Sequence, residues 1–143
     1  CMNGVDERCF LDTNVLVYAH DRSAGAKHER AQVLRRQRWD RGDGCLSMQV
    51  LQEFYVTITR KVPRPLADDA AAEIIADLVT WTIHSPTAPD LLDALRLQRR
   101  HQVAFWDAMI LSSAAVLGCR VLWSEDLNDG QRYGNVQVIN PFR

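Results

Sequence analysis

The chain lacks any long apolar run. None of its segments approaches the roughly 20 residues that a membrane-spanning helix needs. The N-terminus also lacks a basic stretch followed by an apolar one, so we expect no signal peptide. Cys1 precedes Met2, and we expect Cys1 to be an addition ahead of a native start at Met2. These absences predict a cytoplasmic protein with no membrane partner.

Cysteine and histidine are few and scattered. The four cysteines form no CxxC pair, and no set of His and Cys has the spacing of a zinc site. Cys9 and Cys45 lie in apolar, strand-like runs, where we expect buried free thiols, as is usual in a reducing cytoplasm. The glycine-rich patterns GxGxxG and GxxxxGK are missing too, which excludes nucleotide binding through such a loop.

Neither sign of charge dominates the composition. The 17 Lys and Arg face 18 Asp and Glu, for a formal net charge of −1. A hydrophobic content of 47% and a length of 143 residues predict one globular domain spanning residues 1–143. Any one basic cluster fits a solvated helix face, whereas several clusters around an acidic site would bind phosphates. The clusters are RRQRWDR (35–41), TRKVPR (59–64) and RLQRR (96–100).

Short apolar segments alternate with helical patterns along the chain. Such alternation indicates crossover connections, and therefore an α/β fold with a mostly parallel sheet of four to five strands flanked by helices on both faces. In such sheets, ligands bind outside the carboxyl ends of the strands. We expect strands at 9–11, 45–46, 81–84, 120–123 and 136–139, and helices from residue 13 and near 27–39, 48–61, 67–79, 89–100 and 105–117.

Four acidic residues lie where this fold would bring them to one edge of the sheet. Asp12 and Asp126 each follow a predicted strand. Glu53 lies early in the helix after a strand, and Asp107 lies on the apolar face of its helix. Carboxylates gathered in this way repel one another, and the usual remedy in an all-oxygen site is a hard divalent cation, Mg²⁺ or Mn²⁺. The pattern therefore predicts metal-assisted chemistry on phosphate.

Each acid taken singly also has an ordinary explanation. Asp12 could cap a helix, and Asp107 could interact with the helix dipole in a first turn. Glu53 could be a surface residue, and Asp126 could cap the loop that follows it. Four separate ordinary roles would not predict a common edge, so the conjunction favours a site.

The segments that carry these acids also resemble a known family. They are FLDTNVLVYA, LSMQVLQEFYVTITRK, FWDAMILSSAAVLGC and VLWSEDL, followed by a closing NPF at 140–142. In this order they are similar to the motifs of PIN-domain proteins, most of all to the VapC-type toxins of bacterial toxin–antitoxin pairs. The resemblance runs from about residue 8 to the end of the chain.

The resemblance implies a single PIN-like domain with Mg²⁺- or Mn²⁺-dependent ribonuclease activity. It further implies an RNA substrate, a cognate antitoxin protein and a homodimer. By similarity, the catalytic and metal-binding quartet would be Asp12, Glu53, Asp107 and Asp126, with Asn14 and Ser124 in supporting positions.

The implied reaction is hydrolysis of an RNA phosphodiester by metal-activated water. We expect Asp12 and Asp107 to be direct ligands, because they are the acids most committed to the interior. Asp126 and Glu53 would complete the site directly, through water, or by orienting the nucleophile. The basic clusters and aromatic side chains would select RNA by its shape and its unpaired bases.

The sequence is also compatible with other functions. A metal-dependent nuclease acting on DNA would carry the same acids. A non-catalytic PIN module that binds RNA or a protein would use the same pocket without cleavage. A phosphorylated receiver domain also collects acids at a sheet edge, but neither Lys27 nor Lys61 follows a late strand, as its partnering lysine should.

Overall fold

The computed structural model describes residues 7–143, and the expectation about Cys1 lies outside them. Strands and helices alternate as predicted. The strands are β1 (Arg8–Leu11), β2 (Gly44–Ser47), β3 (Thr82–His84), β4 (Cys119–Trp123), β5 (Arg132–Tyr133) and β6 (Val136–Ile139). The helices are α1 (Thr13–His20), α2 (Ala26–Arg41), α3 (Met48–Arg60), α4 (Asp68–Leu78), α5 (Ala88–His101) and α6 (Phe105–Val116), with a 3₁₀ turn at Arg22–Ala24.

One sheet holds all of these strands, in the order β3-β2-β1-β4-β6-β5. Every neighbouring pair is parallel except β5 with β6. The sheet therefore has six strands, where the sequence predicted four to five. The additional strand, β5, has two residues, too few to show an alternating pattern. A two-residue turn at Gly134-Asn135 joins it to β6, and Gly134 has a φ of 62°, as such hairpin turns require.

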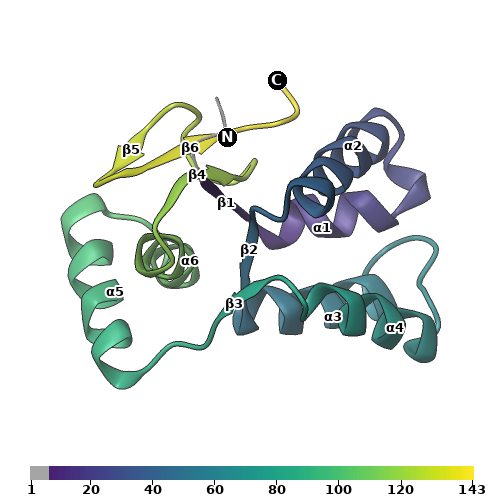
Figure 1. Cartoon of the computed structure of the whole chain (residues 1–143), viewed down its shortest axis with the longest axis horizontal. Coiled ribbons are helices and arrows are strands. Elements are labelled where there is room, and N and C mark those ends of the chain that lie inside the picture. Colours follow the sequence, from purple (N-terminus) through teal and green to yellow (C-terminus); the bar gives the residue numbers. More distant parts are fainter. Residues whose placement is uncertain (1–6) are drawn as a thin grey trace.

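Helices cover both faces of the sheet, as predicted. Figure 1 shows α1 to α4 on one side of the sheet and α5 with α6 on the other. The central strands β1 and β4 are covered from both sides, and Phe10, Leu11 and Leu122 are fully buried. Central strands of a parallel sheet are expected to be apolar on both faces for this reason.

Local sequence explains why α3 starts where it does. Ser47, the last residue of β2, caps the helix by accepting a hydrogen bond from the Val50 backbone N–H at 3.3 Å. Val50, Phe54 and Ile58 then form a fully buried stripe at helical spacing. This stripe fixes the rotation of α3 and so decides which way Glu53 points.

The helix α6 is buried more completely than its sequence pattern suggests. A single apolar stripe was expected, yet every residue from 108 to 114 is buried. The cause is position, because α6 packs against both α5 and β4. Asp107, in the first turn of α6, is thereby held against the interior.

The cysteines require one correction. Cys45 is a buried free thiol, as expected, and so is Cys119. Cys9 is fully buried but is disulfide-bonded, so the expectation of a free thiol there is wrong. The state of Cys9 therefore gives no support to a reducing compartment. Separately, residues 7–143 contain no helix with the length and apolar character to cross a bilayer.

Candidate active site

The pairing of β1 with β4 places two candidate residues side by side. Leu11 and Trp123 are partners in the parallel register, so Asp12 and Ser124 follow them at the same edge of the sheet. The Asp12 N–H donates to the Trp123 carbonyl at 3.0 Å. Residues 112 positions apart in sequence thus meet at the carboxyl ends of the two central strands, where the fold predicts ligand binding.

Asp12 is the most deeply placed of the four acids, with 5% of its surface exposed. It caps α1, and its Oδ1 accepts a hydrogen bond from the Thr13 N–H at 2.7 Å. Its Oδ2 accepts from the Ser124 hydroxyl at 2.7 Å. The pKa of Asp12 is nevertheless raised to about 7, mainly by burial and also by the negative charges of Asp126 and Asp107, which together outweigh the lowering by the two hydrogen bonds.

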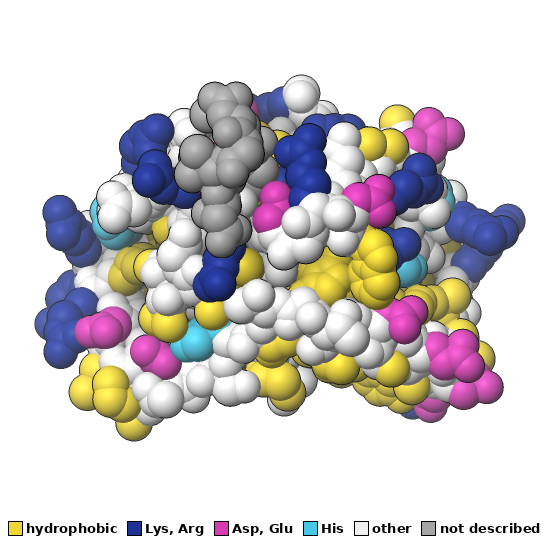
Figure 2. Space-filling view, viewed as in Figure 1, with side chains coloured by type: hydrophobic (Ala, Val, Ile, Leu, Met, Phe, Trp, Pro, Cys, Tyr) yellow, Lys and Arg dark blue, Asp and Glu magenta, His cyan; other side chains and the backbone are white. Residues whose placement is uncertain are grey.

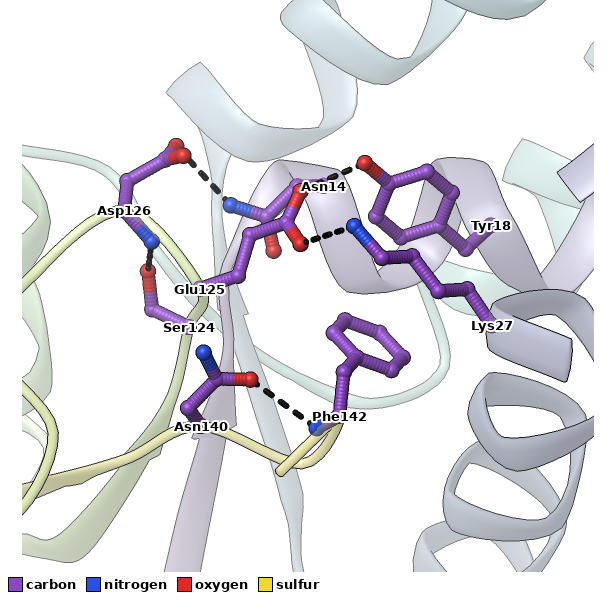
Figure 3. A network of polar contacts seen from close by, with 8 residues as sticks. All are labelled: Asn14, Tyr18, Lys27, Ser124, Glu125, Asp126, Asn140 and Phe142. Carbon is purple, nitrogen blue, oxygen red and sulfur yellow. Dashed lines mark hydrogen bonds and ion pairs between the residues drawn. The ribbon is translucent and has the colours of Figure 1, made fainter.

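Asp126 reaches the site from the loop after β4. Its N–H donates to the Ser124 Oγ at 3.1 Å, so the Ser124 hydroxyl joins Asp126 to Asp12. Its exposed side chain accepts from the Asn14 Nδ2 at 2.9 Å (Figure 3). The Asn14 Oδ1 is buried and has no hydrogen-bond partner in the described chain. Asn14 and Ser124 therefore each bind one of the candidate acids, Asn14 through Asp126 and Ser124 through Asp12.

Glu53 is exposed and approaches from α3. Its Oε1 accepts hydrogen bonds from the Thr13 hydroxyl and the Gln49 Nε2, both at 3.1 Å. The same Gln49 nitrogen lies 3.4 Å from the backbone carbonyl oxygen of Trp106. Gln49 therefore connects Glu53 to the start of α6, where Asp107 lies.

Asp107 completes the quartet through its charge. It is half-buried, and burial raises its pKa, with further contributions from the negative charges of Asp126 and Glu53. Within residues 7–143 its carboxylate accepts no hydrogen bond and pairs with no Lys or Arg. The structure thus brings all four predicted acids into one electrostatically coupled group.

The donor chemistry of this group fits a hard divalent cation. The side chains offer oxygen atoms, and no ion pair within the described residues offsets the charge of any of the four acids. This part of the chain contains no group of three or more His, Cys, Asp or Glu side chains already close enough together to coordinate one metal ion. Mg²⁺ usually keeps several waters and takes one or two carboxylates, so the pair of Asp12 and Asp107 suffices by number.

A second polar network lies beside the quartet, and sequence reasoning missed it. The Glu125 carboxylate accepts from the Tyr18 hydroxyl at 2.5 Å and from the Lys27 Nζ at 2.8 Å (Figure 3). Lys27 also lies over the Tyr18 ring, 5.0 Å from its centre, and Phe142 packs edge-on against that ring. The positive charge of Lys27 offsets the negative charge of Glu125, so Glu125 adds little to the repulsion among the four acids.

The contacts of these additional residues differ in whether the sequence could have predicted them. Gln49 and Glu53 are four positions apart on one helix, a spacing that brings side chains together. Lys27 and Glu125 are 98 positions apart, and no local pattern connects them. Thr13 was not among the predicted site residues, yet its hydroxyl donates to Glu53 beside the Asp12 cap of α1.

A basic cavity lies away from the quartet, near the amino end of β4. Its volume is about 440 Å³, and no acidic side chain lines it. Arg96 and Arg100 reach it from α5 and Arg120 from β4, beside the His101 and Tyr133 rings. On the face drawn in Figure 2, Lys and Arg side chains gather over the left edge, where Figure 1 places α5. The predicted cluster at 96–100 is therefore part of a basic surface.

The model of one protein family, described as PIN domain, matches residues 9–132 of this chain. The chain belongs to the PIN-domain family. The match includes all four acids, the whole of β4 and β1 from Cys9 onward. Among curated proteins, none matches this sequence.

Solved structures provide a second comparison. VapC20 of Mycobacterium tuberculosis, a sarcin–ricin loop-cleaving toxin, superposes with a TM-score of 0.64 at 22% identity, over 82% of this chain and 89% of its own. A toxin–antitoxin complex from Klebsiella pneumoniae gives 0.67 at 17% identity, over 93% and 97%. A DNA-bound VapBC of Salmonella typhimurium gives 0.65 at 16% identity, over 92% and 96%. At these identities the likeness establishes the PIN fold.

Proposed function

We propose that this PIN domain is an Mg²⁺- or Mn²⁺-dependent endoribonuclease that hydrolyses RNA phosphodiester bonds. The observation that carries the proposal is the state of Asp12. Its carboxyl group is almost fully buried, has a pKa of about 7, and lies among acids that no lysine or arginine of the described chain neutralises. A buried carboxylate placed among other acids in this way is costly unless it serves to bind a cation.

The chain's own residues divide the work in this proposal. Asp12 and Asp107 would hold the metal, which, when bound, activates water and offsets the charge that builds up on the phosphate. Ser124 and Thr13 fix the Asp12 carboxylate from two sides, and Asn14 fixes Asp126.

Glu53 has a different part in the same scheme. Both of its hydrogen bonds are made through Oε1, so Oε2 remains available to orient a water molecule and accept its proton. Glu53 is exposed, which suits a group that must meet solvent and substrate.

We further propose that the protein is the toxin of a toxin–antitoxin pair. Its likeness to VapC20 and to two toxin–antitoxin complexes supports this, with coverage of at least 82% of each chain. The proposal includes a cognate antitoxin, a homodimer and a cytoplasmic location. An antitoxin arginine inserted among the four carboxylates would block the site, because guanidinium groups pair well with carboxylates.

The test of nuclease activity uses purified protein with a panel of structured RNAs and DNA oligonucleotides of matched sequence. Each reaction contains Mn²⁺, Mg²⁺ or EDTA. We expect cleavage of RNA with either metal, none with EDTA, and none by Asp107→Asn. The matched control is Asp21→Asn, because Asp21 is also buried but lies at the far end of α1. Cleavage by Asp107→Asn at the wild-type rate would contradict the assignment, and cleavage of DNA alone would contradict the substrate.

A further inference from the structure

Trp106 is the most exposed large apolar side chain among residues 7–143, at 59%. It directly precedes Asp107 in the first turn of α6. Tryptophan is usually well buried, so an indole exposed to water next to the candidate ligand Asp107 indicates a surface that binds another molecule.

The neighbouring Phe105 restricts the position of this indole. Its ring meets the Phe105 ring edge-on, with centres 4.8 Å apart and an interplanar angle of 71°. Phe105 in turn packs against the buried cluster of Ala94, Ala108 and Met109. The backbone of Trp106 is tied to α3 through its carbonyl oxygen and the Gln49 side chain. The ring is therefore presented to solvent with restricted freedom, which reduces the entropy lost when a ligand binds.

Charge limits what can bind next to the quartet. Four carboxylates repel a phosphodiester until a cation is bound, so an uncharged contact beside them strengthens substrate binding without depending on that charge. An exposed indole supplies such a contact, because a nucleobase can stack on its face whatever the base is. A base within a duplex already has both faces covered by its neighbours, so only an unpaired base can stack on a protein side chain in this way.

We propose that Trp106 is the stacking platform for an unpaired RNA base adjacent to the phosphodiester that is cleaved. The inference rests on the proposed ribonuclease function and adds to it the side chain that would hold the substrate base. Trp106 contacts the substrate in this scheme but none of the reacting atoms, so it determines specificity.

The experiment measures binding of two fluorescent RNA probes in an Asp12→Asn background, which prevents cleavage. One probe is a single strand of about 12 nucleotides, and the other is its blunt duplex. Stacking of one base is worth about 5- to 150-fold in affinity, and we expect Trp106→Ala to lose that factor on the single strand only. Trp106→Phe should retain most of the affinity, because it keeps an aromatic face.

Trp39→Ala is the matched control. Trp39 is 46% exposed and lies beside Gly42 and Gly44, at the opposite end of β2 from the site. It should leave the affinity for both probes unchanged. An unchanged affinity of Trp106→Ala for the single strand, or an equal loss on both probes, would overturn the platform. A third result would also overturn it. If light scattering shows that Trp106→Ala dissociates a dimer, while the affinity for the single strand is retained, then a second copy of the chain covers the ring.

A parallel cleavage assay separates this inference from the proposed function. If wild-type protein with Asp12 intact cleaves RNA and Trp106→Ala cleaves the single strand with the same KM and kcat, only the platform fails. A raised KM with a nearly unchanged kcat supports it. If the wild type neither cleaves nor binds RNA, the ribonuclease proposal fails and the platform with it.

Discussion

Asp12 combines a buried position with a charge that the described chain does not neutralise, and its replacement tests the site most directly. We predict that Asp12→Asn lowers the rate of RNA cleavage by more than about 100-fold, because loss of a residue that merely supports a metal ligand already costs 10- to 100-fold. The fold should persist, since the amide is cheaper to bury and its oxygen can still accept from the Thr13 N–H.

Circular dichroism and thermal unfolding would establish whether the Asp12→Asn protein is folded. Asp21→Asn, at the opposite end of α1, should cleave RNA at the wild-type rate. Full activity in a folded Asp12→Asn protein would exclude Asp12 as a metal ligand.

His20 predicts how stability depends on pH. Burial lowers the pKa of His20 to about 4 from its ordinary 6.5, aided by the positive charges of Arg35 and His28. Between these values the unfolded chain binds a proton that the folded chain does not, so stability falls as the pH falls through this window. The loss from this residue is at most about 3 kcal/mol.

We therefore predict that His20→Leu weakens the pH dependence. Urea unfolding of both proteins at pH 7 and at pH 4.5 measures this. The wild type should lose more free energy of unfolding between the two conditions than the variant does. Equal losses would show that His20 remains protonated in the folded state or is solvated there.

At the scale of elements, the contact between β2 and the residue before β3 leaves room only for glycine. A Cβ added at Gly44 would overlap the six-membered ring of Trp81, which packs against the core. We predict that Gly44→Ala lowers the free energy of unfolding by about 1–3 kcal/mol, as overpacking usually does.

Chemical denaturation would measure this effect, and a double variant provides its control. In a Trp81→Leu background the added methyl group no longer meets the ring, so the cost of Gly44→Ala should shrink. An undiminished cost would place the strain in the backbone of β2 instead.

At the scale of the whole molecule, the proposed ribonuclease function and the basic cavity together predict how RNA binding depends on salt. Arg100 and Arg120 line the cavity and form no ion pair within residues 7–143. If each neutralises one phosphate, replacing either with Ala should reduce the slope of log affinity against log salt by about 0.7 on single-stranded RNA.

Arg22→Ala is the control, because Arg22 is exposed and lies on the short 3₁₀ turn after α1. Filter binding between 50 and 200 mM salt, a range of about fourfold, would measure the slopes. Unchanged slopes in Arg100→Ala and Arg120→Ala would show that the cavity does not contact RNA.

Local sequence determined most of the architecture of this protein. Apolar runs and helical stripes specify elements whose physical cause lies within a few residues, such as the Ser47 cap of α3. Because parallel strands share one carboxyl edge, the same patterns also predict that Asp12 and Asp126 lie together. The four acids could therefore be named from the sequence, and the structure brings them into one group.

Tertiary structure alone decided how that group is held and what surrounds it. The bonds from Ser124 to Asp12 and from Asn14 to Asp126 each cross 112 residues, and the pair of Lys27 with Glu125 crosses 98. Such contacts depend on strand register and on which rotamers the packing allows, and neither is encoded in a short window of sequence. The exposure of Trp106 is of the same kind, because the apolar segment around it predicts burial, and only the packing of α6 against α5 and β4 turns that one ring toward water.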